Sequence, residues 1–257
     1  MIANYHTHTA LCRHASGTER EYVEEAIKNG LKILGFADHA PQFFPTDYYS
    51  HFRMFPEQLE DYVRVIGDLR DEYKKDIEIH IGLEAEYYPE CFDKLIEFIQ
   101  PYGIEYLLLG QHYIANEYDT KEPSTARYYD NEKVTQFVDQ MLEAMNTGKF
   151  TYIAHPDVFR FDGEDEAFYA SEMTRFCEAA KAHSLPLEIN MLGLDERRHY
   201  PSDRFFNIAA KVGCDFVLGC DSHIPSKVAP PEIVAKLYEF AARNGINVFE
   251  TVKLIKP

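Results

Sequence analysis

The sequence predicts an α/β protein whose parallel strands form a closed or nearly closed barrel, within one domain that spans residues 1–257. Seven short β-rich runs alternate with longer amphipathic segments, which is typical of parallel βαβ units. The length of 257 residues suits a single barrel of this type. Side chains that can bind metals follow the strands, and this position favours a barrel over an open sheet. No change in composition marks a linker between domains.

The predicted strands are short runs of β-forming residues separated by the amphipathic segments. In order along the chain, they are Ile2–His6, Lys32–Ala37, Ile77–Leu83, Tyr106–Leu109, Thr151–Ile153, Leu187–Ile189 and Phe216–Leu218. Because parallel strands all end on the same side of a barrel, the residues after these runs are expected to meet at one face.

Six helices are predicted from apolar residues at helical spacing and from residues that begin and end helices. In order, they are Thr18–Asn29, Pro56–Tyr73, Lys133–Asn146, Ala167–His183, Ser202–Val212 and Pro230–Asn244. The first begins with a capping box, in which Thr18 pairs with Glu21, and stops at Gly30. Gly213 and Gly245 stand where the last two helices are expected to end.

The composition excludes several classes of protein. Hydrophobic residues make up 46% and charged residues 27%, which excludes a disordered, collagen-like or coiled-coil chain. Acidic residues outnumber basic ones by 43 to 26, so the net charge of −17 repels a long polyanion and we expect no nucleic-acid partner. A small anion can still enter a site with its own local positive charge.

The cellular setting is expected to be the cytoplasm. No run reaches the roughly 18 apolar residues of a membrane span, and the first ten residues lack the pattern of a secretory signal. The five cysteines are an odd number without a C-x-x-C motif, which argues against a disulfide framework. The sequence carries no signal for an oligomeric state.

Nearly every predicted strand leads into a side chain that can bind a metal. The nine candidates are His6, His8, His14, His39, Glu84, His112, His155, Asp221 and His223. In His6-x-His8 and in Asp221-x-His223, the period of two places both side chains on the same side of the strand. Burying so many ionisable groups together without a cation would be very unfavourable. We therefore predict a metal centre.

The number and type of these donors indicate several ions. One tetrahedral catalytic ion takes three protein ligands and a water, so nine donors fit two or three divalent ions, with one carboxylate as a bridge. Mixed imidazole and carboxylate ligands suit zinc, manganese, iron or cobalt and do not choose between them. His80 and His183 are interpreted as structural, and Cys12 and Cys220 as packing thiols.

Two arginines follow strands on the predicted metal face. Arg160 lies after the strand Thr151–Ile153, and Arg197 lies after the strand Leu187–Ile189. A guanidinium fork matches phosphate oxygens, so we predict that both bind the phosphate of a small substrate. Arg198 is expected to be solvated. The alternative is that these are surface arginines paired with neighbouring acids.

The motifs resemble those of a known family. His6-Thr7-His8, Ala37-Asp38-His39, Gly82-Leu83-Glu84, His112, His155-Pro156 and Cys220-Asp221-Ser222-His223 occur in family order between residues 2 and 225. In this respect the chain resembles the polymerase and histidinol phosphatase (PHP) superfamily. The segment Cys12-Arg13-His14-Ala15-x-Gly17 is similar to that of its stand-alone L-histidinol phosphate phosphatases.

The resemblance implies a distorted (β/α)7 TIM-like barrel with a trinuclear centre. It implies that His6, His8, Glu84 and Asp221 hold the first ion, that Glu84 bridges to a second ion held with His112 and His155, and that His14, His39 and His223 hold the third. Asp38 and Glu86 do not match ligand positions. They are expected to accept hydrogen bonds from ligating imidazoles.

The resemblance also implies a reaction. We expect hydrolysis of L-histidinol phosphate to L-histidinol and phosphate, a step of histidine biosynthesis, by attack of a metal-activated hydroxide. The leaving alkoxide needs a proton, for which Asp221, His223 and a metal-bound water are the candidates. Two alternatives stay open. One is another PHP-type phosphoesterase that acts on nucleotides or nucleic-acid ends, and the other is a metal-binding protein without catalysis.

Overall fold

The computed structural model describes residues 1–119 and 121–257. Its main sheet is parallel, with the order β1-β2-β3-β4-β7-β8-β9-β10. The strands are β1 (Ala3–Asn4), β2 (Ile33–His39), β3 (Glu78–Ala85), β4 (Tyr106–Leu109), β7 (Tyr152–Ile153), β8 (Leu187–Asn190), β9 (Phe216–Gly219) and β10 (Val248–Phe249). The predicted α/β barrel is confirmed, and the first seven of these strands lie at or within a residue or two of the seven predicted runs.

A seam between the first and last parts of the chain closes the barrel at its carboxyl end. Thr7, just after β1, forms a parallel bridge with Ser222, just after β9. The His8 amide donates to the Ser222 carbonyl at 3.0 Å, and the Cys220 amide donates to the Asn4 side chain at 2.9 Å. At the other end, β10 pairs with the first half of β9. This closure brings both ends of the ligand-bearing sequence to one place.

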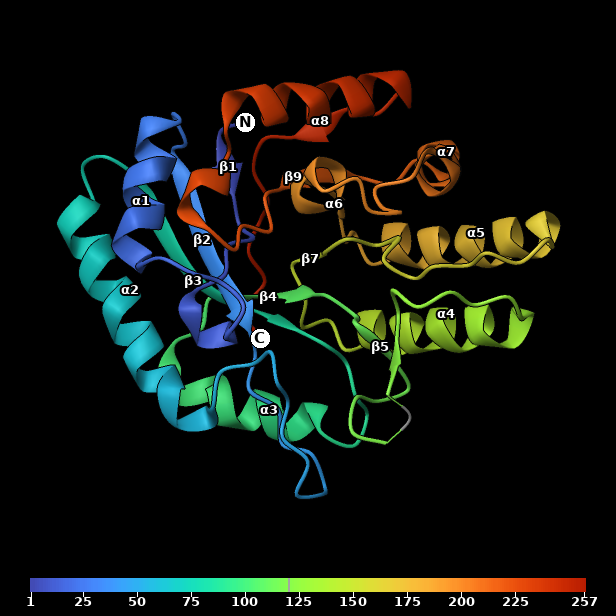
Figure 1. The fold of residues 1–257 in the computed structure, drawn as a ribbon, viewed down its shortest axis with the longest axis horizontal. Coiled ribbons are helices and arrows are strands. Elements are labelled where there is room, and N and C mark those ends of the chain that lie inside the picture. The colour runs from blue at the N-terminus through green and yellow to red at the C-terminus, as the bar shows by residue number, and fades with distance from the viewer. Residues whose placement is uncertain (120) are drawn as a thin grey trace.

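The helices lie around the outside of the sheet, with α1 and α2 on one side and α4, α5 and α7 on another (Figure 1). They are α1 (Glu19–Lys28), α2 (Leu59–Tyr73), α3 (Phe92–Ile99), α4 (Asn131–Asn146), α5 (Glu166–Ala182), α6 (Met191–Asp195), α7 (Asp203–Val212) and α8 (Pro231–Arg243). The capping box predicted for α1 is present: Thr18 accepts from the Glu21 amide, and the Glu21 carboxylate accepts from the Thr18 amide. The predicted helices are confirmed.

Several short elements were not predicted. They are α3, α6, β10, the antiparallel pair β5 (Tyr113–Ile114) and β6 (Glu122–Pro123), and the 3-10 turns η1 (Ala10–Cys12), η3 (Gln100–Tyr102) and η4 (Pro225–Lys227). The segment predicted as one helix from Pro56 begins as the 3-10 turn η2 (Pro56–Gln58) and continues as α2.

Apolar side chains fill both faces of the sheet. A large cluster lies between the strands and the helices, and a smaller one includes Tyr5, Tyr106, Tyr152 and Val217. Alternation along β4 explains the two clusters, since Leu107 and Leu109 belong to the large one and Tyr106 and Leu108 to the small one. The small cluster fills the barrel interior below the carboxyl ends of the strands.

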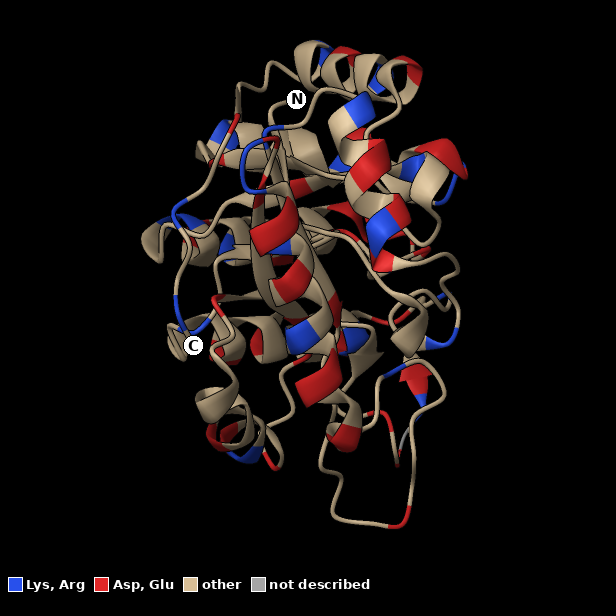
Figure 2. Ribbon diagram, turned by 90° about the vertical axis from the view of Figure 1, so that its left-hand side faces the viewer, with Lys and Arg blue, Asp and Glu red and all other residues tan. Residues whose placement is uncertain are grey.

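The charged residues lie mainly on the outside. On the face shown in Figure 2, acidic positions are prominent along the helices and basic ones are interspersed among them, in keeping with the net charge of −17. Among residues 1–119 and 121–257, no helix combines the length and the apolar character that crossing a bilayer requires.

Candidate metal centre and active site

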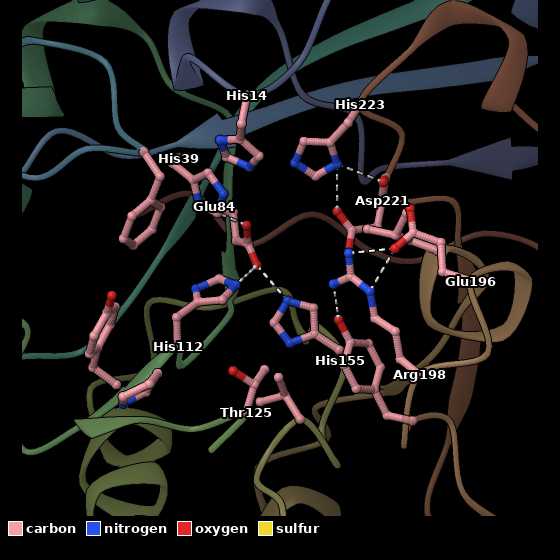
Figure 3. Close-up of a pocket in the computed structure, with 16 residues that line it drawn as sticks. His14, His39, Glu84, His112, Thr125, His155, Glu196, Arg198, Asp221 and His223 are labelled. Atoms are coloured by element: carbon pink, nitrogen blue, oxygen red, sulfur yellow. Dashed lines mark hydrogen bonds and ion pairs between the residues drawn. The ribbon is translucent and has the colours of Figure 1, made fainter. Parts of the chain in front are cut away.

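All nine predicted donors converge at the carboxyl end of the barrel. His6 and His8 follow β1, His39 ends β2, Glu84 lies in β3, His112 follows β4, His155 follows β7, and Asp221 and His223 follow β9; His14 comes just after η1. Seven of them line a pocket of about 390 Å³, which Figure 3 shows in close-up. His6 and His8 lie beneath it and are fully buried. The parallel direction of the strands thus brings the donors together at one face of the barrel, as predicted.

The Glu84 carboxylate stands at the centre of the cluster. Its Oε1 is 2.8 Å from His155 Nε2 and 3.6 Å from His112 Nε2. Its Oε2 is 3.0 Å from His39 Nδ1, and 3.5 Å and 3.6 Å from the Nε2 atoms of His8 and His6. One oxygen therefore faces one group of imidazoles and the second faces another, which is the arrangement of a carboxylate that can bridge two cations.

The spacing of the donors fits divalent ions. Asp221 Oδ1 lies 3.1 Å from His8 Nε2 and 3.5 Å from His6 Nε2, and the two Nε2 atoms are 3.2 Å apart. Two ligands bound at 2.0–2.1 Å to one tetrahedral zinc lie about 3.4 Å apart. Three donors at this mutual distance can share an ion.

Unpartnered atoms in the pocket also fit cations. Glu84 Oε2, His39 Nδ1, His155 Nδ1 and His223 Nε2 are buried, and none has a hydrogen-bond partner among residues 1–119 and 121–257. Buried polar atoms of folded proteins nearly always have a partner. A metal ion would satisfy the lone pairs of Glu84, His39 and His223, so the donor set fits the group that the sequence predicts.

Burial and mutual charge shift the pKa values of these side chains. Burial acts to raise the pKa of Glu84, but the histidines around it, led by His112 and His39, hold that pKa well below its ordinary value. Burial lowers the pKa of His6, but the negative charges led by Glu188 and Asp221 raise it well above its usual range. Burial lowers the pKa of His39, which keeps that ring neutral. The pocket therefore attracts positive charge, as protons or as metal ions.

A second set of acceptors orients the imidazoles. His6 Nδ1 is 2.8 Å from Glu188 Oε1, His112 Nδ1 is 2.8 Å from Glu86 Oε1, and His8 Nδ1 is 3.4 Å from Asp38 Oδ1. Each contact leaves the Nε2 atom facing the cluster, and such support usually sets the tautomer of a metal-binding histidine. Asp38 and Glu86 occupy the places expected for them.

Glu188 was missed by the sequence analysis as a functional residue. It lies in β8, is fully buried, and accepts from the His155 amide at 2.9 Å as well as from His6. The available signal was a charged residue inside the short apolar run Leu187–Ile189. A carboxylate in such a run needs a partner, and here the partners are candidate ligands.

Two of the arginines pair with neighbouring acids, which is the alternative that the sequence left open: Arg160 Nε lies 3.2 Å from Asp162 Oδ1, and Arg198 lies 2.7 Å from Glu196. Arg198 is 40% exposed, as expected, but it also lines the pocket, where Tyr200 accepts its hydrogen bond at 2.8 Å (Figure 3). Arg160 and Arg197 lie in an adjoining depression that Arg198 and Tyr200 also line. The chain after β8 forms α6 and then turns at Arg197, whose φ is 55°. Both neighbouring arginines line the depression, and Arg198 alone of the two also lines the pocket.

The other predicted residues lie where they were expected. His80 is 2.7 Å from Glu105, outside the pocket, and His183 contacts Asn146. The five cysteines are free and buried. Cys12 Sγ nevertheless lies within 4.8 Å of donor atoms of His14 and His223.

The chain is similar to several known proteins. A family model described as PHP domain matches residues 4–192. A protein of Deinococcus radiodurans named probable histidinol-phosphatase is 30% identical over 235 residues, covering 88% of this chain and 88% of that protein. A probable histidinol-phosphatase of Schizosaccharomyces pombe is 25% identical over 265 residues, covering 93% and 86%.

A solved structure has the same fold. The histidinol phosphate phosphatase of Lactococcus lactis subsp. lactis, complexed with zinc, L-histidinol and phosphate, matches with a TM-score of 0.73. Its sequence is 21% identical, and the match covers 99% of this chain and 97% of that one.

Proposed function

The chain belongs to the PHP domain family, and from this premise we propose that it is a metal-dependent phosphomonoesterase. Its proposed reaction is the hydrolysis of L-histidinol phosphate to L-histidinol and phosphate, as a step of histidine biosynthesis. The convergence of nine imidazole and carboxylate donors, Glu84 among them, at the carboxyl end of the barrel carries the proposal. Relatives named histidinol-phosphatase, which align over most of this chain, support the choice of substrate.

The donors divide into three groups in this proposal. His6, His8, Glu84 and Asp221 hold one divalent ion; Glu84, His112 and His155 hold a second; His14, His39 and His223 hold a third. Zinc, manganese, iron and cobalt suit these ligands. When bound, such ions supply the acidity that makes water a nucleophile at neutral pH and the positive charge that phosphate oxygens need.

The arginines bind the phosphate group. Arg198 reaches the pocket wall, and the adjoining depression is lined by Arg197 and by Arg160, whose Nε lies 3.2 Å from Asp162. A guanidinium group can donate two hydrogen bonds to a pair of phosphate oxygens, and its positive charge stabilises the negative charge that develops as the ester bond breaks. Arg198 is held by Glu196, so the substrate phosphate replaces or shares that partner.

Asp221 and His223 are the side-chain candidates for the proton that the leaving alkoxide needs, a role that competes with their proposed binding of an ion. His223 Nε2 is buried and unpartnered among the described residues, and His223 Nδ1 is 3.0 Å from the Asp221 carbonyl. Both side chains line the pocket beside Arg198 and Tyr200. Full turnover by Asp221→Asn with complete metal content would remove Asp221 from this role.

The setting and partners follow from the same features. We propose a cytoplasmic enzyme, because its free cysteines suit a reducing compartment. Its partner is a small phosphorylated molecule, because the net charge of −17 disfavours nucleic acid.

A phosphate-release assay tests the proposal. Protein purified without chelators is analysed for metals and given L-histidinol phosphate, nucleoside monophosphates or single-stranded DNA. We expect release from L-histidinol phosphate, its loss in His8→Asn, and its retention in the matched control His80→Asn, which lies outside the pocket. Phosphate release only from nucleotides or DNA would indicate that the protein is a different phosphoesterase. A filled centre that releases phosphate from none of them would indicate a non-catalytic metal protein.

A further inference from the structure

Arg53 is a fully buried arginine with no predicted role. It is 1% exposed and lies in the irregular segment of residues 40–55 between β2 and η2. An arginine keeps its charge when it is buried, so the loss of water must be offset by acceptors with good geometry. Where its hydrogen bonds lead therefore indicates what the residue supports.

The guanidinium of Arg53 connects two buried carboxylates. Arg53 Nη1 donates to Glu86 Oε2, while Nη2 and Nε donate to Glu117 Oε2 at 2.7 Å and 3.0 Å. The other oxygen of Glu117 accepts from the Tyr48 hydroxyl at 3.0 Å. The other oxygen of Glu86 is the acceptor that lies 2.8 Å from His112 Nδ1. Arg53 is thus one contact removed from a proposed metal ligand.

His112 needs this outside support. Its side chain is 24% exposed, whereas those of His6, His8 and His155 are 2% exposed or less. It follows the end of β4 and precedes the short strand β5, so no regular element fixes it directly. The Glu86 carboxylate contacts the Nδ1 atom of His112 through one oxygen and accepts from Arg53 through the other.

The same guanidinium also supports the aromatic wall of the pocket. It lies over the Phe52 ring at 4.4 Å from the centroid. Phe52 lines the pocket and meets the His112 ring edge-on at a centroid distance of 5.8 Å. Arg53 therefore contacts two of the groups that flank His112, Glu86 and Phe52.

We propose that Arg53 is a positioning residue for the metal centre. It holds Glu86 as the acceptor for His112 Nδ1, so that His112 presents Nε2 to the ion shared with Glu84 and His155. This inference rests on the proposed metal centre. It predicts that loss of Arg53 weakens one ion of the set and leaves the others in place.

Metal-binding titrations of four proteins test the inference. Zinc affinities and stoichiometries are measured against a competing chelator for the wild type, Arg53→Met, His112→Asn and the double variant. We expect Arg53→Met to weaken one class of ion by about 10–100-fold, the range found for groups that orient metal ligands. The double variant should bind zinc as His112→Asn does, because Arg53 acts through His112. In assays with L-histidinol phosphate, Arg53→Met should lower kcat by a larger factor than it changes KM.

The matched control is Arg243→Met. Arg243 also pairs with a carboxylate, Asp203, and lies over an aromatic ring, that of Phe240, but on the outside of α8. It should bind zinc as the wild type does. If Arg53→Met does not fold, Glu117→Gln, which keeps the shape of the cluster, should weaken the same class of ion to a smaller extent.

Several outcomes would overturn the inference. The first is a folded Arg53→Met protein that binds zinc with the affinity of the wild type, or an unchanged zinc affinity in Glu117→Gln where that variant replaces it. The second is a double variant in which the losses of zinc affinity from Arg53→Met and His112→Asn multiply, because Arg53 would then act independently of His112. A wild-type protein that binds no metal would instead refute the proposed function, so the two failures are distinguishable.

Discussion

Replacing Glu188 with glutamine should damage both the stability of the protein and its metal centre. Glu188 is fully buried, and its carboxylate accepts from His6 Nδ1 at 2.8 Å, the His155 amide at 2.9 Å, Asn190 Nδ2 at 2.8 Å and the Tyr152 hydroxyl at 3.3 Å. Glutamine has the same size but offers one acceptor oxygen, and its NH2 group would face donors.

The expected magnitude follows from these four contacts. At least one buried donor loses its acceptor, which costs about 1–3 kcal/mol of unfolding free energy. His6 also loses the acceptor that orients its ring. Loss of such a partner typically reduces metal affinity or activity by about 10–100-fold.

Urea unfolding of the metal-free protein, followed by circular dichroism, measures the first effect. Metal analysis and phosphate release from L-histidinol phosphate measure the second. Glu239→Gln on the exposed face of α8 is the matched control and should behave as the wild type. A Glu188→Gln protein within about 0.5 kcal/mol of wild-type stability, the usual range of surface substitutions, and with undiminished metal affinity would refute the reasoning.

Three further predictions concern the metals, the pH and a glycine. Chelators should abolish hydrolysis. Adding zinc or manganese at about 100 times its Kd to the metal-free protein should raise Tm by roughly 5–10 °C, because binding then contributes about 2.7 kcal/mol to the free energy of unfolding. An unchanged Tm would contradict a structural contribution of the ions. The hydrogen bond to Glu105 raises the pKa of His80, so this pair stabilises the fold fully below about pH 6.5 and loses its effect as the pH rises through the higher folded pKa. The urea midpoint should fall over that window in the wild type, and an equal fall in His80→Asn would argue against the pair. Gly110→Ala should lower the free energy of unfolding by about 1–3 kcal/mol and reduce the metal content, because an added Cβ would overlap the Glu84 carboxylate. Calorimetry measures the first effect and metal analysis the second. A Gly110→Ala protein with the metal content of the wild type would contradict the prediction.

The sequence predicted the fold where local signals and tertiary packing agree. Each strand of the barrel is a short apolar run followed by a polar side chain, and Thr18 with Glu21 marks the start of α1 as predicted. The helix α3 was missed although its residues Phe92–Ile99 have apolar residues on one face. It is short, its cap residue Cys91 makes no side-chain cap hydrogen bond, and so no local signal marks where it begins.

The candidate site was predictable to the extent that strand ends define it. Residues such as His39 and Glu84 end buried strands, and parallel direction alone brings them together. The place of Arg198 was not predictable, because it depends on α6 and on the turn at Arg197. Arg53 was not predictable either, since its partners Glu86 and Glu117 come from segments that only the folded chain brings together.

The seam between β1 and β9 has a consequence for how the protein is made. Asn4 and Cys220, which it joins, are 216 positions apart in the chain. During synthesis His6 and His8 emerge from the ribosome long before Asp221, which lies next to them in the folded chain. Contacts of such long range form late and slowly. The proposed metal centre can therefore assemble only once Asp221 has been synthesised, and a product that terminates before this residue would retain just a part of the donor set.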